Sequence, residues 1–269
     1  MKFREIACTA LFAVFLTGIQ CPDQPIRVLF LSKSSGFEHP VIRTVDGQPS
    51  VVESVLSDIA IDLGATLTST KDASQINAEN LRNFDVVIFF TSGDLTQPGT
   101  DGQTPMSEQG LGDLLEWIRR GGGFIGLHSA SDTFHSESSE SVSDYIEMLG
   151  GEFRQHGTQF EGRLLLADPD HPTMADLPEE WILTEEWYLF TNVKTDAIHP
   201  LLVFDPGAEG DTQPIYDVDP YPIAWWRCYG LGRVYYTGLA HNADTWQQPS
   251  MHTMVQNAIE WSARRSAPR

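Results

Sequence analysis

The chain has 269 residues, which is enough for one large α/β domain or two small ones with well-buried cores. Its 17 lysines and arginines are outnumbered by 37 aspartates and glutamates, so the formal net charge is −20. Such a charge repels nucleic acid unless basic residues cluster locally, and the sequence contains no basic cluster, so we expect no nucleic-acid partner. We interpret the acidic surplus as favouring solvation and colloidal stability.

The first residues have the pattern of a targeting segment. Lys2 and Arg4 provide a basic start, and residues 6–16 are almost wholly apolar. A basic start followed by a short apolar run is typical of secretory signals, and this run is too short to span a bilayer. We therefore expect residues 1–21 to direct export to the periplasm, the cell envelope or the medium, with no transmembrane span. The alternative is an apolar N-terminal strand or helix.

The three cysteines do not form a disulfide framework. Cys8 would be removed with the signal segment, which leaves two cysteines in the mature chain. Cys21 is a candidate for a lipid anchor because it follows the apolar run, but Gln20 stands where that motif normally has a small residue. Cys228 lies beside two tryptophans, and we expect it to be a small buried apolar residue.

The chain after the targeting segment is expected to form one domain. Residues 22–26 are interpreted as a linker, 27–264 as a single domain and 265–269 as a tail. The predicted strands of the first half are 26–32, 65–70, 84–90 and 124–127, and the predicted helices are 51–63, 76–81, 111–119 and 142–149. This alternation predicts an α/β fold with a doubly wound, mainly parallel sheet of the flavodoxin-like type.

The second half of the chain has a different pattern. Short apolar runs are separated by polar turns, and a final amphipathic segment predicts a helix. The runs are 163–166, 181–185, 201–204, 223–226 and 233–237, and the helix is 251–263. We expect these added β-rich C-terminal segments to extend the sheet and to close over a crevice at its edge.

A glycine-rich stretch over residues 121–132 predicts the end of a helix, a buried strand and a sharp turn. Gly126, His128 and Ala130 have the spacing of a nucleophile elbow, in which small neighbours lift the central side chain above the sheet edge. The central residue here is a histidine rather than a serine or cysteine. Crevices lie beyond the carboxyl ends of parallel strands, so the loop containing His39 should face the same crevice.

Six motifs follow one another along the chain. They are Ser34-Ser35-Gly36-Phe37-Glu38-His39, residues 84–88, residues 121–132, Gly150-Gly151-Glu152-Phe153 with His156, Glu185-Glu186-Trp187-Tyr188, and residues 232–241. In order and spacing they resemble the ThuA-like, or trehalose-utilisation, proteins over Val28 to Trp261. The resemblance implies a fold similar to class I glutamine amidotransferases. It does not imply their chemistry, which needs a thiolate where His128 stands. The family more often has aspartate at the position of Glu185.

The resemblance also implies a group of site residues. The histidines that match its motif positions are His39, His128, His156 and His241. Neutral imidazoles near a carboxylate suit zinc, manganese or iron. We expect His128, His156 and His241 to be the candidate ligands of a divalent metal, zinc or manganese, although no local motif such as His-Glu-x-x-His supports this.

The expected catalytic residues are His128, Asp132 and Glu186. Either Asp132 or Glu186 would act as the base or would orient the histidine, and this chemistry could proceed with or without a metal. The expected substrate-binding residues are His39, Ser129, Trp187 and Tyr188. The two aromatic residues could provide a stacking platform for a sugar, although aromatic residues near strands more often pack in the core. We leave His135, His171, His199 and His252 out of the site.

Two functions remain open. The resemblance implies an exported enzyme that processes a sugar, either a glycoside or a 3-keto-glycoside, by acid–base chemistry with or without a metal. The alternative is a non-catalytic carbohydrate-binding or scaffold protein that uses the same crevice. Hydrolysis of another ester or amide is disfavoured, because the elbow lacks a cysteine.

Overall fold

The computed structural model describes residues 24–207 and 212–264. The expected signal segment, the candidate lipid anchor Cys21, the first residues of the linker and the tail lie outside these ranges. Within them, none of the helices has the length and apolar character needed to cross a membrane.

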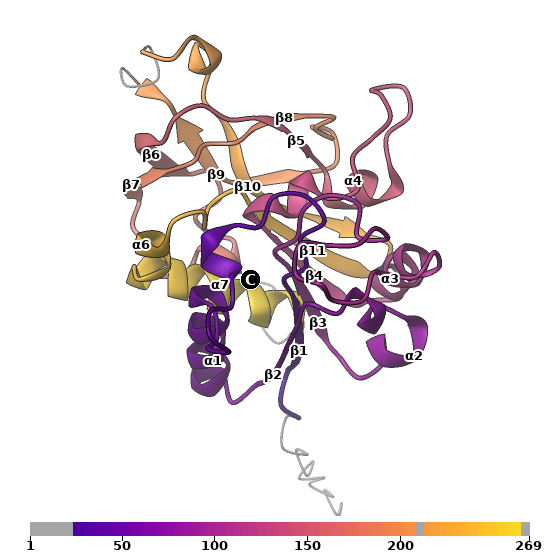
Figure 1. The fold of residues 1–269 in the computed structure, drawn as a ribbon. Coiled ribbons are helices and arrows are strands. Elements are labelled where there is room, and N and C mark those ends of the chain that lie inside the picture. Colours follow the sequence, from indigo (N-terminus) through magenta and orange to yellow (C-terminus); the bar gives the residue numbers. More distant parts are fainter. Residues whose placement is uncertain (1–23, 208–211, 265–269) are drawn as a thin grey trace, which may run out of the picture.

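Among the described residues, nine strands form one sheet in the order β2-β1-β3-β4-β11-β10-β9-β6-β7 (Figure 1). The parallel strands are β1 (Arg27–Leu31), β2 (Thr66–Thr70), β3 (Val86–Phe89), β4 (Gly123–Leu127) and β11 (Gly232–Thr237). The antiparallel extension consists of β10 (Tyr221–Tyr229), β9 (His199–Asp205), β6 (Phe160–Leu166) and β7 (Glu180–Glu185). The expected parallel core with added β-rich C-terminal segments is therefore confirmed.

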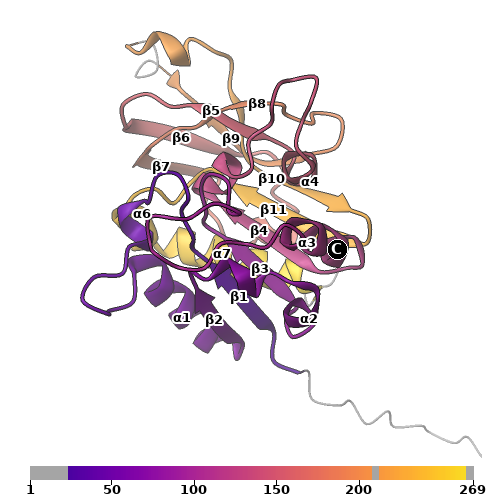
Figure 2. The same ribbon diagram turned by 45° about the vertical axis from the view of Figure 1, so that its right-hand side comes forward.

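Two short strands, β5 (Glu152–Gln155) and β8 (Leu189–Thr191), form a separate antiparallel ribbon. In the views of Figures 1 and 2 this ribbon lies at the same end of the molecule as β6 and β9. It was not predicted from the sequence. It matters for the site because Phe153 and Tyr188, which belong to or flank it, line the pocket described below.

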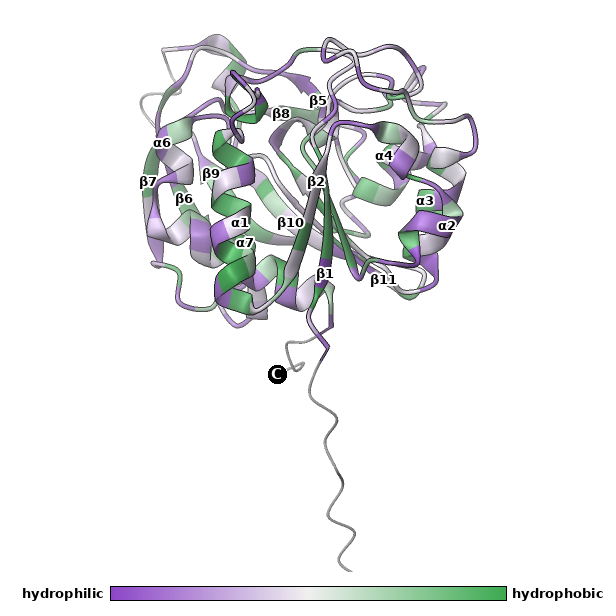
Figure 3. Cartoon of the chain, turned by 60° about the horizontal axis from the view of Figure 1, so that its bottom comes forward, coloured by the Kyte–Doolittle hydropathy of each residue, from purple (hydrophilic) through white to green (hydrophobic). Residues whose placement is uncertain are grey.

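Helices cover both faces of the sheet. Figure 3 shows the sheet from its edge at β1 and β2, with α1 (Val51–Leu63), α6 (Ala243–Trp246) and α7 (Pro249–Ser262) on one side and α2 (Ala78–Leu81), α3 (Gly110–Arg119) and α4 (Asp144–Leu149) on the other. Short 3-10 turns occur at Pro40–Ile42, Ala73–Gln75, His128–Asp132, Pro172–Met174 and Pro214–Tyr216.

The helices on both faces of the sheet explain why the parallel strands are continuous apolar runs. On β1, Val28 and Phe30 pack in the core layer that contains α1 and α7, whereas Leu29 and Leu31 pack in the layer that contains α3 and α4. Successive residues of a strand face opposite sides, so a strand buried on both sides reads as a continuous apolar run.

Helix α1 shows how local signals set an element's limits. Ser50 accepts a hydrogen bond from the backbone of Glu53, and the Glu53 carboxylate accepts one from the backbone of Ser50, which completes a capping box. Gly64 ends the helix in the left-handed conformation at φ 60°. The predicted range 51–63 is therefore confirmed.

The expectation for Cys228 was wrong, because its side chain is exposed. The residue lies next to the end of β10, and the aromatic residues that precede it in the sequence, Trp225 and Trp226, do not cover it.

Candidate functional site

Four segments that are far apart in the sequence meet at one edge of the sheet. His128 follows β4, His241 follows β11, His39 lies in the loop after β1, and Glu186 follows β7. One donor atom from each of these side chains lies within 4.8 Å of the others, and we call these four residues the histidine cluster. Such a set of imidazoles and one carboxylate suits a divalent transition metal.

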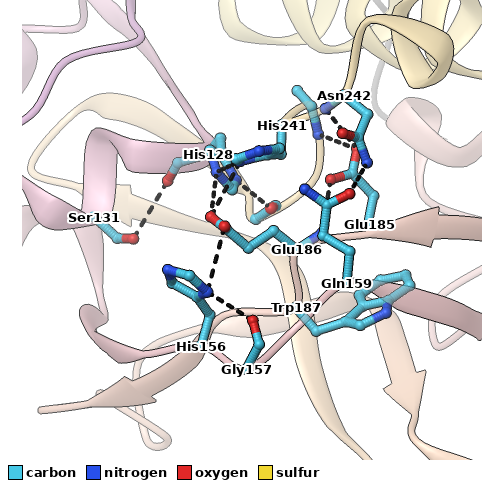
Figure 4. Close-up of polar contacts among 12 residues, drawn as sticks. His128, Ser131, His156, Gly157, Gln159, Glu185, Glu186, Trp187, His241 and Asn242 are labelled. Carbon is cyan, nitrogen blue, oxygen red and sulfur yellow. Dashed lines mark hydrogen bonds and ion pairs between the residues drawn. The ribbon is translucent and has the colours of Figure 1, made fainter. Parts of the chain in front are cut away.

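His128 is held in one orientation and one tautomer. Its backbone φ is +44°, an unusual value for a residue with a side chain, and the residue is fully buried. Its Nδ1 lies 2.8 Å from the carbonyl oxygen of Gly238, so Nδ1 must carry a proton and donate it. In the neutral ring the lone pair is then on Nε2, which faces Nδ1 of His241 at 3.2 Å and Oε2 of Glu186 at 3.5 Å (Figure 4).

His241 is positioned by a carboxylate that is not a member of the cluster. Glu185 is fully buried, and its Oε1 accepts hydrogen bonds from the backbone N–H groups of Ala240 at 3.2 Å and Asn242 at 3.4 Å. Its Oε2 accepts one from the backbone of Glu186 at 3.1 Å. One side chain therefore ties together the two segments that carry His241 and Glu186, whose Nδ1 and Oε2 lie 3.1 Å apart.

His39 contributes a buried nitrogen that lacks a partner. Among the described residues, its Nδ1 has no hydrogen-bond partner, although only 3% of the residue is exposed. Its ring stands edge-on to those of His128 and His241, with centroid distances of 4.8 and 5.1 Å. Burial, followed by the neighbouring His128 and His241, lowers the pKa of His39 to about 2. The ring is therefore neutral, which is the form that binds metals.

Glu186 is ionised. Burial raises the pKa of its carboxyl group, but hydrogen bonds with His128 and His241 outweigh burial and bring the pKa well below its ordinary value. Nδ1 of His128 donates to Gly238, so a hydrogen bond from Nε2 to the Glu186 carboxylate requires a second proton on the ring. Without that proton, Nε2 and the carboxylate are two acceptors that face each other. Such a pair is stable only with a second proton on the ring or a cation nearby.

The histidine cluster borders a pocket of about 390 Å³, which we call the histidine pocket. The residues that line it are Phe37, His39, Asp132, Phe153, His156, Glu186, Tyr188 and His241. The ring of Tyr188 packs on that of His128, with 4.2 Å between centroids. The pocket therefore offers imidazoles, two carboxylates and aromatic surface to one small ligand.

The group of four donors shares His128 and His241 with the expected metal ligands, and it adds Glu186, which was expected to be catalytic. His39, expected to bind substrate, belongs to the group of four donors, whereas His156, expected to bind metal, does not. The side chain of His156 is 40% exposed, and its Nδ1 lies 2.9 Å from the carbonyl oxygen of Gly157 and 3.3 Å from Oε1 of Glu186. His156 thus lies at the rim of the pocket.

Two expected substrate-binding residues do not line the pocket. Trp187 is fully buried, stacks on Phe204 at a centroid distance of 3.9 Å and donates its Nε1 hydrogen to the carbonyl of Phe160. It faces the core because its chain neighbours, Glu186 and Tyr188, face the pocket. Ser129 is also fully buried, and its hydroxyl has no partner among the described residues.

Asp132 lines the pocket, and its partner was missed from the sequence. Its Oδ1 lies 2.5 Å from Nε2 of His135, whose Nδ1 lies 2.8 Å from Oε1 of Glu152. The Glu152 carboxylate is buried and also accepts hydrogen bonds from Ser136 and Asn192. The hydrogen bond with Asp132 is the largest of the causes that raise the pKa of His135 to about 9. The three-residue spacing of Asp132 and His135 in the sequence could have indicated that their side chains interact.

Comparison with known families gives one match. The model of the ThuA family, described as trehalose utilisation, matches residues 27–262. No curated protein matches the chain significantly.

Two solved structures support the fold. A ThuA-like protein from Bacteroides uniformis has a TM-score of 0.69 and 18% sequence identity, and the match covers 91% of this chain and 94% of that one. A ThuA-like protein from Parabacteroides merdae has a TM-score of 0.66 and 18% identity over 91% of this chain and 92% of that one. A weaker match, at a TM-score of 0.48 and 11% identity, is to a GMP synthase protein from Thermoplasma acidophilum and covers 90% of this chain and 96% of that one.

Proposed function

The chain belongs to the ThuA family, described as trehalose utilisation, and from that premise we propose that its histidine pocket binds a divalent metal and transforms a glycoside or 3-keto-glycoside by acid–base chemistry. Membership of the family links the chain to the utilisation of sugars. The observation that carries the chemical part of the proposal is the meeting of four donor atoms from His39, His128, Glu186 and His241 within 4.8 Å.

The donor set fits a metal in three ways. The Nδ1 of His39 is buried without a partner among the described residues. The hydrogen bond from Nδ1 of His128 to Gly238 leaves Nε2 as the coordinating atom, as outer hydrogen bonds do in known metal sites. The ionised Glu186 faces this nitrogen, and a cation would relieve the contact between the two acceptors. Zinc and manganese both accept such ligands.

Within this proposal Asp132 is the base. It is the pocket carboxylate that stays outside the four-donor group, and because His135 holds its Oδ1, Oδ2 is the atom that takes the proton. A carbonyl at C3 of a sugar acidifies the neighbouring C–H bond. Asp132 takes that proton from C2 and leaves an enediolate. The enediolate either expels the glycosidic oxygen from C1, which takes up a proton as it leaves, or is protonated at C3 while the C2 hydroxyl proton passes to the C3 oxygen, which moves the carbonyl to C2. A bound metal would supply Lewis-acid stabilisation of negative charge on the carbonyl oxygen.

The test combines metal analysis with an activity screen. Protein without a histidine tag is analysed for zinc and manganese, and turnover of 3-keto-glycosides and glycosides is measured with and without a chelator. We expect bound metal, and a loss of turnover of about 100-fold or more in His128→Ala or after metal removal. His199→Ala is the matched control, because His199 is exposed and stacks on Trp226 away from the pocket.

Unchanged turnover in His128→Ala would contradict the proposed chemistry. Binding of a saccharide with neither turnover nor bound metal would instead favour a carbohydrate-binding protein.

We also propose that the protein is exported. The basic start and the apolar run within residues 1–21 support this. N-terminal sequencing of protein recovered from the cell envelope and medium tests it, and a mature chain that still begins at Met1 would contradict it.

A further inference from the structure

Another pocket lies between the β5–β8 ribbon and the segment that leads into β10. Both strands of the ribbon, the 3-10 turn at Pro214–Tyr216 and the first residues of β10 contribute to its lining. Its volume is about 430 Å³, within the range of roughly 300–1,000 Å³ typical of small-molecule sites. No described residue lines both this pocket and the histidine pocket, so we treat it as a separate site and call it the ribbon pocket.

Most of the lining of the ribbon pocket is apolar and remains accessible to solvent. Covering such surface with an apolar group gains about 25 cal/mol for each Å² removed from water. The pocket therefore favours a ligand with an apolar side chain. The apolar residues that solvent still reaches include Leu189, Phe190, Val193, Ile215 and Val218, the last of which is 45% exposed.

Two opposite charges line the same pocket without pairing with each other. Arg154 lies in β5, Asp219 lies two residues before β10, and both are exposed. Within the described ranges, neither side chain has a hydrogen-bond or ion-pair partner. Other arginines of this acidic chain, such as Arg27 and Arg163, pair with aspartates. The ribbon pocket thus offers a guanidinium and a carboxylate to a ligand.

A free α-amino acid matches this lining. One of its carbon atoms carries an ammonium, a carboxylate and a side chain, which correspond to Asp219, Arg154 and the apolar surface. A guanidinium holds a carboxylate through two parallel N–H groups, and an ammonium donates to a carboxylate. Among the described lining residues, Gln155 and Tyr221 carry the remaining polar side-chain groups, which are too few to pair the hydroxyl groups of a sugar.

We propose that the ribbon pocket binds a free apolar α-amino acid. Its carboxylate lies on Arg154, its ammonium lies on Asp219, and its side chain packs against Phe190 and Ile215. The proposal depends neither on a metal nor on the sugar chemistry proposed above, because the residues that carry it lie outside the histidine pocket.

Calorimetric titration of the purified protein at pH 6 with phenylalanine, glycine, phenylalaninamide and N-acetylphenylalanine tests the site. At this pH a free amino group carries its proton and a free carboxyl group is ionised. We expect phenylalanine to bind more tightly than glycine by about tenfold or more, because glycine has no side chain to cover the apolar lining. The amide lacks the carboxylate and the N-acetyl derivative lacks the ammonium, so each should bind about fivefold more weakly than phenylalanine.

Two variants assign each charge of the ligand to its partner. Arg154→Ala should weaken phenylalanine binding about fivefold without weakening phenylalaninamide binding, because the amide lacks the carboxylate that Arg154 holds. Asp219→Asn should weaken phenylalanine binding about fivefold without weakening that of N-acetylphenylalanine, which lacks the ammonium. Arg82→Ala and Asp58→Asn are the matched controls. Both residues are exposed, directly after α2 and within α1, at the opposite end of the molecule from the ribbon (Figures 1 and 2).

The contrary results overturn the proposal. If phenylalanine does not bind, or binds no more tightly than glycine, the ribbon pocket is not a site for an apolar amino acid. If both derivatives bind as tightly as phenylalanine, the charges of the ligand are not recognised. If the control variants weaken phenylalanine binding as much as the pocket variants do, Arg154 and Asp219 do not hold the ligand.

Discussion

The Glu185 side chain connects two segments of the site that lie far apart in the sequence. Its carboxylate accepts three backbone hydrogen bonds, from Ala240, Asn242 and Glu186, and so orients two members of the histidine cluster. Outer residues that orient ligands typically change metal affinity by about 10- to 100-fold when they are replaced. We therefore expect Glu185 to act as a positioning residue for the metal.

We predict a graded loss of zinc affinity at this position. Glu185→Gln keeps one acceptor oxygen and should weaken zinc binding about tenfold, whereas Glu185→Ala leaves buried N–H groups unpaired and should weaken it more. Competition with a chelator of known affinity measures both. Glu180→Gln, at the exposed start of the same strand, is the control. Wild-type affinity in Glu185→Ala would show that the carboxylate does not position the ligands.

His135 leads to a prediction about stability and pH. Its pKa is raised from 6.5 to about 9, chiefly by its hydrogen bond with Asp132. A raised pKa contributes stability that is complete below pH 6.5 and is lost as the pH rises through about 9. Its side chain is 46% exposed, so solvent screening limits the contribution to about 1 kcal/mol.

Thermal unfolding of the wild type and of His135→Gln between pH 6 and pH 10 checks this prediction. The stability difference between the two proteins should shrink across pH 6.5 to 9. Parallel curves over that window would mean that the charge of His135, facing Asp132 and Glu152, does not stabilise the fold.

Glu185 and His135 show why part of the site could not be predicted from the sequence. Glu185 acts through backbone groups 55 and 57 positions away, so neither its residue type nor its neighbours reveal its role. His135 lies three residues from Asp132, which was a local signal, but its second partner Glu152 is fixed only by the fold. His128 was found because small residues flank it in an elbow-like turn.

At the scale of elements, strong local signals predicted structure well. Helix α1 has an apolar stripe, a capping box and a terminal glycine, and its limits follow from them. The strands of the parallel core are buried on both faces and appear as apolar runs. In contrast, β5 and β8 have 4 and 3 residues and are only partly buried, so their pairing rather than their composition defines them.

At the scale of the whole molecule, the site depends on how the antiparallel end of the sheet curves back toward the parallel core. In the strand order, three strands separate β7 from β11, yet Glu185 at the end of β7 bonds to the backbone just after β11. The antiparallel extension must therefore bring its last strand back over the carboxyl edge of the parallel core. The sequence predicted both halves, but nothing in a run of apolar residues specifies this return, and Glu186 joins the histidines only because of it.

Because the antiparallel end of the sheet curves back in this way, a bound metal would connect segments that lie far apart in the sequence. An ion held by His39, His128, Glu186 and His241 would join the segments after β1, β4, β7 and β11. A ligand that binds only the folded state, at a free concentration 100 times its dissociation constant, stabilises that state by about 2.7 kcal/mol. For a domain of this size, this corresponds to a rise in Tm of about 5–10 °C.

Thermal unfolding with and without zinc can therefore separate the two donor sets, the one expected from sequence and the one present in the structure. We predict that His39→Ala loses the rise in Tm, because its buried Nδ1 belongs to the four-donor group, and that His156→Ala keeps it, because that side chain lies at the exposed rim. Each substitution removes one imidazole group, so each variant serves as the control for the other. A zinc-dependent rise that survives in His39→Ala and disappears in His156→Ala would restore His156 as the ligand, and with it a site centred nearer the mouth of the pocket.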